Sequence, residues 1–479
     1  MLFNSIEFAI FLPIVFLLYW FVFSKNLKLQ NLFIVVVSYI FYGWWNWRFL
    51  FLIAFTSVCS FGAGILIDKY RETPSKAKAV NVVNIVINLL ILGVFKYYDF
   101  FVISFADVFF GGKTDGLLLK VILPVGISFY TFQALSYSID VYRGKLEPTR
   151  DVIQFFAFVS FFPQLVAGPI ERATNLLPQF AGPRSFDFET GASGMRQILW
   201  GLFKKMVIAD NCAIYVDQVF SAYQTQSGST LLLAAFFFAF QVYGDFSGYS
   251  DIAIGTSKLF GIRLMRNFNV PYFSRDIAEF WRRWHISLTT WFRDYVYIPL
   301  GGSRCSKAKI VRNTFIIFLL SGFWHGANWT FIAWGAYHAL LFLPLILMGK
   351  NRKYRNTVAE GRILPTIKEV GQMLLTFFLV TFGWIIFRAE SIEQAWIYFC
   401  SLLSWSLFSV PWIDSPTFIL KLMIALPLLI ILEWSGRDKE CPIQFSGIGP
   451  FGQWSVYVLL SIVVFAFGAT SESFIYFQF

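Results

Sequence analysis

Apolar runs of about twenty residues recur along the whole chain, and each run is long enough to cross a bilayer as a helix. Hydrophobic residues make up 57% of the chain, charged residues only 14%, and the mean hydropathy is +0.62. These values exclude an ordinary soluble protein. The runs lie near residues 4–23, 31–43, 49–67, 80–105, 151–168, 195–220, 229–243, 309–323, 329–348, 371–388, 416–434 and 453–469.

The runs predict an all-α, polytopic integral membrane protein with roughly ten to twelve transmembrane helices, together with amphipathic or re-entrant helices. The first run has no basic residue before it and no small-residue cleavage site after it, so we expect a retained helix. The basic stretch Lys25–Lys28 that follows favours an N-terminus outside the cytoplasm. No linker separates a soluble domain and no internal repeat is visible, so we expect a single membrane domain over residues 1–479.

The net charge of +11 comes from 39 basic and 28 acidic residues. The basic residues gather in short loops between the apolar runs, which is the pattern of the positive-inside rule and of attraction to anionic lipid headgroups. No soluble basic domain is present to bind nucleic acid, so we expect the lipid bilayer and no nucleic acid as a partner. The basic loops lie near residues 69–78, 143–150, 304–312, 350–355 and 437–439.

The five cysteines are scattered along the chain, with no CxxC pair and no spacing typical of metal ligands. They are most simply small buried hydrophobic residues. The sequence therefore predicts no metal site.

One histidine lies between two apolar runs, in the segment Ser321–Thr330. A histidine is costly in hydrocarbon, so an intramembrane histidine indicates a functional site that faces a cavity or the protein interior. His325 is flanked by Gly322 and Gly326, which let backbone and substrate approach closely, and Asn328 follows one turn away. A titratable imidazole shielded from bulk water suits a general base. We therefore predict a functional role for His325.

The segment from Trp281 to Tyr295 has aromatic residues at helical spacing and predicts one amphipathic helix at the cytoplasmic interface or in the protein core. His285 lies on its aromatic face, where it is either a stacked structural residue or a member of the site. The neighbouring arginines suit an anionic acyl donor, such as one carrying a coenzyme A phosphate. These arginines are Arg282, Arg283 and Arg293.

The third histidine, His338, lies thirteen residues beyond His325. If residues 327–347 form one helix, the two histidines are roughly 20 Å apart along its axis and cannot act on one substrate. We expect a structural or interfacial role for His338.

Two further segments are unusual. Tyr243–Asp251 combines acids, hydroxyls and glycines at a spacing that does not fit a calcium loop, and it predicts a helix break with capping groups or a cavity lining. The aromatic tail Phe474–Phe479 suits an anchor at the membrane interface. Alternatively, the tail enters the functional site predicted around His325 and Tyr476 relays an acyl group there, because phenols can form covalent intermediates.

Several motifs, taken in order, resemble the membrane-bound O-acyltransferase (MBOAT) superfamily, and in particular its bacterial branch of alginate O-acetylation proteins. The resemblance covers nearly the whole chain. A single short match would be weak, whereas several in the right order are specific. The motifs are Phe161–Gln164, Ala167–Ile170, Phe280–Thr289, Trp291–Tyr295, Tyr297–Gly302 and Gly322–Gly326.

The resemblance implies an active site at the bottom of a central funnel inside the membrane, with His325 and His285 as catalytic residues. An acyl thioester such as acetyl-CoA would arrive from the cytoplasm as a co-substrate, with no bound cofactor. His325 would take the proton from an acceptor hydroxyl, and backbone amides of residues 322–326, or His285, would stabilise the oxyanion. Substrate binding is further expected of Arg282, Arg283, Arg293, Asp294, Trp324 and Asn328.

The same resemblance implies a location in the bacterial inner membrane, a periplasmic SGNH-hydrolase-like acetyltransferase as partner and a polysaccharide acceptor such as alginate. D-alanyl transfer to teichoic acid and peptidoglycan O-acetylation are close alternatives, because nothing in the sequence encodes a sugar preference. A glycan transporter or flippase and a non-catalytic scaffold are alternatives from other classes. A transporter is expected to show repeat symmetry and matching broken helices, neither of which we find.

Overall fold

The structure, a computed structural model, describes residues 1–469 except 113, 115, 414 and 446–448. These residues form helices and no strand, which confirms the predicted all-α class. They divide into two compact units, one of Met1–Met195 with Ala253–Met265 and the other of Arg196–Ile252 with Arg266–Phe479. The single domain over the whole chain stays a prediction. The aromatic tail with Tyr476 lies outside the described residues.

The first unit holds the N-terminal helices. They are α1 (Ile6–Leu17), α2 (Leu27–Gly43), α3 (Leu50–Lys69), α4 (Pro74–Leu92), α5 (Tyr98–Phe109), α6 (Ile127–Tyr142), α7 (Val152–Ser160), α8 (Phe162–Leu165) and α9 (Ala173–Leu176). Two helices have residues in both units, namely α10 (Phe188–Leu202) and α12 (Gly228–Leu259).

The second unit holds the remaining helices and the π-helical segments Phe203–Ala209 and Arg293–Tyr297. Its helices are α11 (Asp210–Ser221), α13 (Ile277–Arg283), α14 (Ile286–Phe292), α15 (Lys307–His325), α16 (Trp329–Leu347), α17 (Ile367–Arg388), α18 (Ile392–Leu402), α19 (Pro416–Ser435) and α20 (Pro450–Phe467).

Six helical stretches of the described residues are long and apolar enough to cross a membrane, which confirms the polytopic prediction. They are Trp47–Lys69, Pro74–Phe109, Gly228–Leu259, Trp329–Leu347, Ile367–Arg388 and Pro450–Phe467, and two shorter apolar helices cover Ile6–Val22 and Leu27–Gly43. The count of ten to twelve crossings stays a prediction. Helix α15, which ends at His325, is not among the six.

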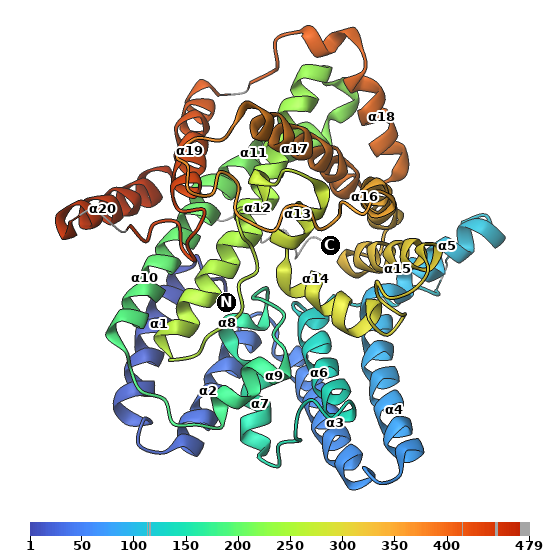
Figure 1. Cartoon of the computed structure of the whole chain (residues 1–479), viewed down its shortest axis with the longest axis vertical. Helices are drawn as coiled ribbons and strands as arrows, with labels where there is room; N and C mark the ends of the chain where they lie inside the picture. Colours follow the sequence, from blue (N-terminus) through green and yellow to red (C-terminus); the bar gives the residue numbers. More distant parts are fainter. Residues whose placement is uncertain (113, 115, 414, 446–448, 470–479) are drawn as a thin grey trace. The chain divides into compact units, whose positions relative to one another are not determined.

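The helices α3, α4 and α6 lie side by side in the first unit (Figure 1). A buried chain of polar side chains joins them: Ser60 donates to the Asn84 Oδ1 at 3.3 Å, and the Asn84 Nδ2 donates to Ser138 at 2.9 Å. These hydrogen bonds replace the bonds that water would make with the same polar groups. In a membrane, apolar contacts alone do not drive helices together, because lipid is as apolar as the side chains, so interhelical hydrogen bonds stabilise the packing.

The predicted helix break at Tyr243–Asp251 is wrong, because α12 runs through it without interruption. Its acids are neutralised by two buried lysines of the π-helical segment rather than used as caps. The Lys205 ammonium lies 2.7 Å from the Asp245 carboxylate, and the Lys204 ammonium lies 2.5 Å from that of Asp251. The aspartates of this stretch are therefore compatible with a continuous helix, because the two lysines of the neighbouring segment pair with their carboxylates.

The predicted run at 151–168 does not form one helix. Helix α7 ends at Ser160, Phe161 adopts a non-helical backbone conformation, and α8 begins at Phe162. Pro163 in the first turn of α8 cannot continue the preceding helix, because it lacks a backbone donor. Hydropathy alone did not reveal this break, since the residues on both sides are apolar and buried.

The helices α15 and α16 pack closely against each other through glycine. A Cβ on Gly335 would lie 2.3 Å from the Phe318 carbonyl oxygen, closer than real contacts allow. We predict that Gly335→Ala forces the two helices apart and lowers the free energy of unfolding by about 1–3 kcal/mol. The measurement is thermal unfolding of the purified protein in detergent.

The matched control for this substitution is Gly371→Ala in α17, where an added Cβ meets nothing within 4 Å. It should leave stability unchanged or raise it by about 0.5–1 kcal/mol, because alanine favours the helix. Equal melting temperatures for the Gly335 variant and the wild type would contradict the close approach of α15 and α16.

Candidate functional site

His325 is the last residue of α15 and is buried, with 4% of its surface exposed. Aromatic rings surround its imidazole: the ring centroids of Trp324, Trp334 and Phe387 lie 5.1, 5.2 and 5.3 Å from it. These rings keep bulk water away from the imidazole, as the sequence predicts for a shielded base.

The glycines on either side of His325 serve its packing. A Cβ on Gly322 would lie 2.1 Å from the Phe331 carbonyl oxygen, and a Cβ on Gly326 would lie 2.1 Å from the Phe331 ring. Phe331 therefore occupies the space beside both glycines. The sequence predicts a close approach at these glycines, and in the structure it is Phe331 that approaches them.

His285 lies between α13, which ends at Arg283, and α14, which begins at Ile286. Its φ of +43° is in the left-handed region, which residues other than glycine rarely adopt. The predicted single helix over 281–295 is therefore wrong. The Ile286 N–H donates to the Asn267 carbonyl at 2.8 Å, and this bond to a distant segment replaces the helical one. Aromatic periodicity continues across the break, so the sequence pattern did not reveal it.

The structure brings His285 and His325 together, with their ring centroids 6.3 Å apart. This separation is too large for a direct hydrogen bond between the two rings. Trp324 contacts both imidazoles, and Phe246 of α12 packs against His285 at 4.6 Å. Burial lowers the pKa of His285 to about 3, so its imidazole is neutral at pH 7.

His338 lies on α16 and is fully buried, and within the described part of the chain neither of its ring nitrogens has a hydrogen-bond partner. The ring centroids of Trp281 and Trp334 both lie 5.0 Å from it. Because His325 also packs on Trp334, the two histidines share a neighbour. The predicted separation along one helix is therefore wrong, since they lie on the adjacent helices α15 and α16. The packing agrees with the structural role predicted for His338.

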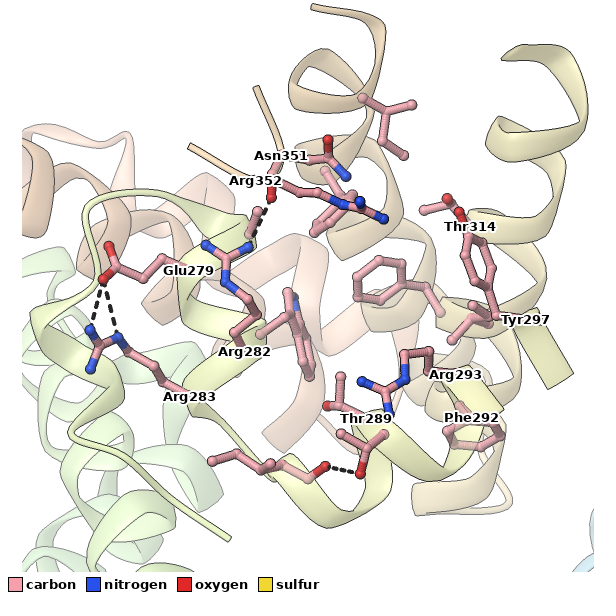
Figure 2. A pocket seen from close by; sticks show the side chains of 18 of the residues that line it. Glu279, Arg282, Arg283, Thr289, Phe292, Arg293, Tyr297, Thr314, Asn351 and Arg352 are labelled. Carbon is pink, nitrogen blue, oxygen red and sulfur yellow. Dashed lines mark hydrogen bonds and ion pairs between the residues drawn. The ribbon is translucent and has the colours of Figure 1, made fainter. Parts of the chain in front are cut away.

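A cavity of about 980 Å³, named here the arginine pocket, is lined by residues of α13, α14, α15, α16 and the segment that follows α16 (Figure 2). Trp281 and Ser321 form part of its wall, and Ser321 lies one turn before His325 on α15. Neither His285 nor His325 lines the pocket itself. Its lining includes one acid, Glu279, and the five arginines Arg282, Arg283, Arg293, Arg352 and Arg355.

Two of the arginines that were predicted to bind substrate form hydrogen bonds with other residues of the chain. The Arg283 guanidinium donates two hydrogen bonds, of 2.9 and 3.1 Å, to the buried Glu279 carboxylate, which also accepts two from the Arg275 guanidinium. Arg282 donates to the backbone carbonyls of Asn351, at 2.8 Å, and Tyr354. Both side chains therefore hold the pocket wall in place, whatever else they bind.

Arg293 and Arg352 also line the pocket, and each bonds to another side chain. Arg293 is exposed and pairs with its neighbour Asp294 at 2.7 Å, and Arg352 donates to the Ser303 hydroxyl at 3.3 Å. Figure 2 shows Arg293 entering the pocket from the end of α14 and Arg352 from the segment after α16. Two guanidinium groups on separate segments are suited to bind phosphate groups.

Three residues predicted to bind substrate do not line the pocket. Asp294 pairs with Arg293, and Trp324 packs between the two histidines. Asn328 caps α16, because its Oδ1 accepts a bond from the Thr330 N–H at 3.0 Å. Their part in substrate binding stays a prediction.

Sequence reasoning missed Asn267, whose side chain contacts His285, and the pocket-lining Arg352 and Arg355. Asn267 is eighteen residues before His285 and belongs to no motif, so only the fold reveals it. The two arginines were visible in the basic loop 350–355, but that loop was interpreted only as a topological signal and as a contact for anionic lipid headgroups. Among the residues that the structure describes, no three His, Cys, Asp or Glu side chains gather to hold a metal ion.

Comparison with known proteins gives one family match and several long relatives. The sequence model of the membrane-bound O-acyltransferase family, MBOAT, matches residues 148–387. The chain is 42% identical to a probable alginate O-acetylase, AlgI, of Pseudomonas aeruginosa over 398 residues, which cover 83% of this chain and 74% of the relative. It is 36% identical to a probable alginate O-acetylase of Pseudomonas putida, over all of both chains. It is 32% identical to a peptidoglycan O-acetyltransferase of Helicobacter pylori, over 100% of this chain and 98% of the relative.

The buried Glu279 cluster yields a stability prediction. Arg283→Met leaves the Glu279 carboxylate buried with Arg275 as its only arginine partner among the described residues. Breaking a buried pair costs about 3–5 kcal/mol, and we expect a loss near the lower end because Arg275 remains. The exposed Arg293→Met is the matched control and should change stability by less than about 0.5 kcal/mol. Equal unfolding curves for the two variants would show that Arg283 is not structural.

Proposed function

Because this chain belongs to the membrane-bound O-acyltransferase family, we propose that it transfers an acetyl group from acetyl-CoA to a hydroxyl group destined for a cell-surface polysaccharide such as alginate. It is a multi-pass membrane protein and an O-acyltransferase that transfers an acyl group at the membrane. The observation that carries the proposed chemistry is the pair of buried imidazoles, 6.3 Å apart, with the arginine pocket one helical turn from His325.

The arginine pocket supports a donor that carries phosphate groups. Its five arginines face a single acid, and that acid is already bonded to Arg275 and Arg283. An excess of positive charge in a concave site attracts an anionic ligand and binds its oxygens through charge-assisted bonds. Coenzyme A supplies such phosphates at one end and a thioester at the other, so the acyl end would extend toward Ser321 and His325.

The proposed reaction is a direct acyl transfer. One imidazole takes the proton of the acceptor hydroxyl while the hydroxyl oxygen attacks the thioester carbon, and the family motif assigns this role to His325. The carbon–sulfur bond then breaks, and the thiolate receives the proton, giving an ester and a free thiol. The oxyanion formed on the way needs hydrogen-bond donors, for which backbone amides near residue 325 or His285 were expected.

The acceptor and the setting are also part of the proposal. The alginate relatives support an exopolysaccharide, whereas the whole-length similarity to the Helicobacter pylori enzyme supports peptidoglycan as the second candidate. The family resemblance supports a periplasmic SGNH-hydrolase-like acetyltransferase that completes the transfer, and a location in the bacterial inner membrane. The Tyr476 relay stays a prediction.

The first test of this function replaces the catalytic histidine. In membranes supplied with radiolabelled acetyl-CoA and acceptor, His325→Ala should lower label transfer by about 10²–10⁴-fold, because one of the two catalytic imidazoles is lost. The matched control is His338→Phe, which keeps an aromatic ring at a position where the histidine nitrogens bond to none of the described residues; it should transfer label at nearly the wild-type rate. Normal transfer by His325→Ala at equal protein level would refute the assigned role, and no transfer by the wild type would refute the donor.

The second test concerns the donor pocket. Arg352→Ala and Arg293→Ala should each raise the KM for acetyl-CoA about tenfold or more with little change in kcat, because a charge-assisted bond is worth about 1.5–3 kcal/mol. Arg304→Ala, an exposed arginine that does not line the pocket, should leave the KM unchanged. An unchanged KM in the double variant of Arg293 and Arg352 would place the donor elsewhere.

A further inference from the structure

The amide of Asn267 contacts His285 at one ring nitrogen. Its Oδ1 lies 3.1 Å from the His285 Nδ1, and the same oxygen accepts bonds from the Ser287 hydroxyl at 2.9 Å and the Ser287 backbone N–H at 3.3 Å. On its other side, the Asn267 Nδ2 donates to the Ser250 hydroxyl of α12 at 3.1 Å. All four side chains are buried, so these bonds are not exchanged with water.

These contacts fix which end of the amide is the oxygen. A backbone N–H can only donate, so the amide atom that faces the Ser287 N–H must be an acceptor, which is the oxygen. An amide oxygen in turn only accepts. The His285 Nδ1 therefore carries the proton and donates it to Asn267. The Ser287 hydroxyl does not compete for Nδ1, because it lies 3.5 Å from that nitrogen and 2.9 Å from the amide oxygen.

The opposite nitrogen of the ring is left as an acceptor. A neutral imidazole with its proton on Nδ1 has a lone pair on Nε2. The Nε2 atom of His285 is buried and has no hydrogen-bond partner among the residues that the structure describes. This lone pair can therefore accept a proton or a hydrogen bond from the hydroxyl group of a bound molecule.

The backbone holds the ring in this orientation. The Asn267 carbonyl accepts a bond from the Ile286 N–H at 2.8 Å, and the Arg283 carbonyl accepts one from the Asn269 N–H at 2.9 Å. The segment 267–269 is thus hydrogen-bonded to the backbone on both sides of His285. These bonds stabilise the left-handed φ of +43° at His285, which is unfavourable without such constraint. Asn267 therefore positions the residue through its main chain and its side chain together.

We infer that Asn267 is a positioning residue for acyl transfer, which fixes the proton of His285 on Nδ1 so that Nε2 accepts the proton of the attacking hydroxyl. The inference rests on the proposed function and changes one of its roles. The hydroxyl oxygen forms a bond to the thioester carbon as its proton moves to Nε2, and the leaving thiolate takes that proton as the carbon–sulfur bond breaks. A neutral His285 with a bare Nε2 has no N–H to offer the oxyanion, so that role falls to other donors, including His325.

The direct test reads the tautomer of His285 by ¹⁵N NMR of the full chain in lipid, labelled at histidine. The chain has only 3 histidines, so His338→Phe and His325→Gln suffice to assign their signals. We expect a protonated Nδ1 and an unprotonated Nε2 for His285. A protonated Nε2 would overturn the inference and restore His285 as an oxyanion donor beside His325 as the base. This result does not depend on whether acetyl-CoA is the donor.

The kinetic test uses Asn267→Leu and Asn267→Asp. Removing the hydrogen-bond partner that orients a functional histidine typically lowers activity about 10–100-fold. We expect Asn267→Leu to lower kcat by this factor and to leave the KM for acetyl-CoA unchanged. The same substitution should remove the preference for the Nδ1 tautomer of His285. Asn267→Asp should restore most of the activity, because a carboxylate also accepts the Nδ1 proton. An unchanged kcat in Asn267→Leu, or no recovery in Asn267→Asp with the His285 tautomer intact, would overturn the inference.

A control separates positioning from general destabilisation. Asn211 is also a buried amide of the second unit, and its Nδ2 donates to backbone carbonyls of Met206, Val207 and Phe467 but, among the described residues, to no histidine. Asn211→Leu should leave the His285 signals unchanged. If it alters them as Asn267→Leu does, the effect is not specific to the Asn267 contact and the inference fails. A wild type that shows the expected tautomer but transfers no acetyl group would refute the proposed function alone.

Discussion

Polar groups buried among apolar side chains must find their partners within the protein, because no water is there to serve them. In the second unit this requirement is met around α12. Lys205 lies 2.7 Å from both Asp210 and Asp245, which lets an acid-rich stretch stay helical. Because the helix is continuous there, it presents Phe246 to the ring of His285 and Ser250 to the amide of Asn267.

The same requirement divides the candidate site into a charged part and an apolar part. The arginines line a cavity where anionic groups can enter, whereas the two imidazoles lie among tryptophan and phenylalanine rings. A thioester that carries phosphate groups matches this division. Its uncharged reacting carbon suits the aromatic part of the site, and its phosphates suit the arginines. Aromatic surroundings also keep water from competing with the acceptor hydroxyl for the acyl group.

Much of the fold class was predictable because hydropathy and helical spacing are local properties of the chain. The predicted runs at 329–348 and 371–388 correspond closely to Trp329–Leu347 and Ile367–Arg388. The interruptions were less predictable. The break at His285 and the continuity of α12 both depend on partners distant in the sequence, namely Asn267 for the first and Lys204 with Lys205 for the second.

The sequence by itself determined that this chain is an α-helical membrane protein of the acyltransferase kind, with His325 and His285 as its candidate catalytic residues. Residue type, apolar length and motif order carry that information without reference to distant contacts. Only the tertiary structure decided that the two imidazoles lie 6.3 Å apart, that Arg283 is bonded to Glu279, and that an asparagine outside every motif contacts His285. These are pairings between segments far apart in the chain, and such pairings are set by packing and hydrogen-bond geometry rather than by any local pattern.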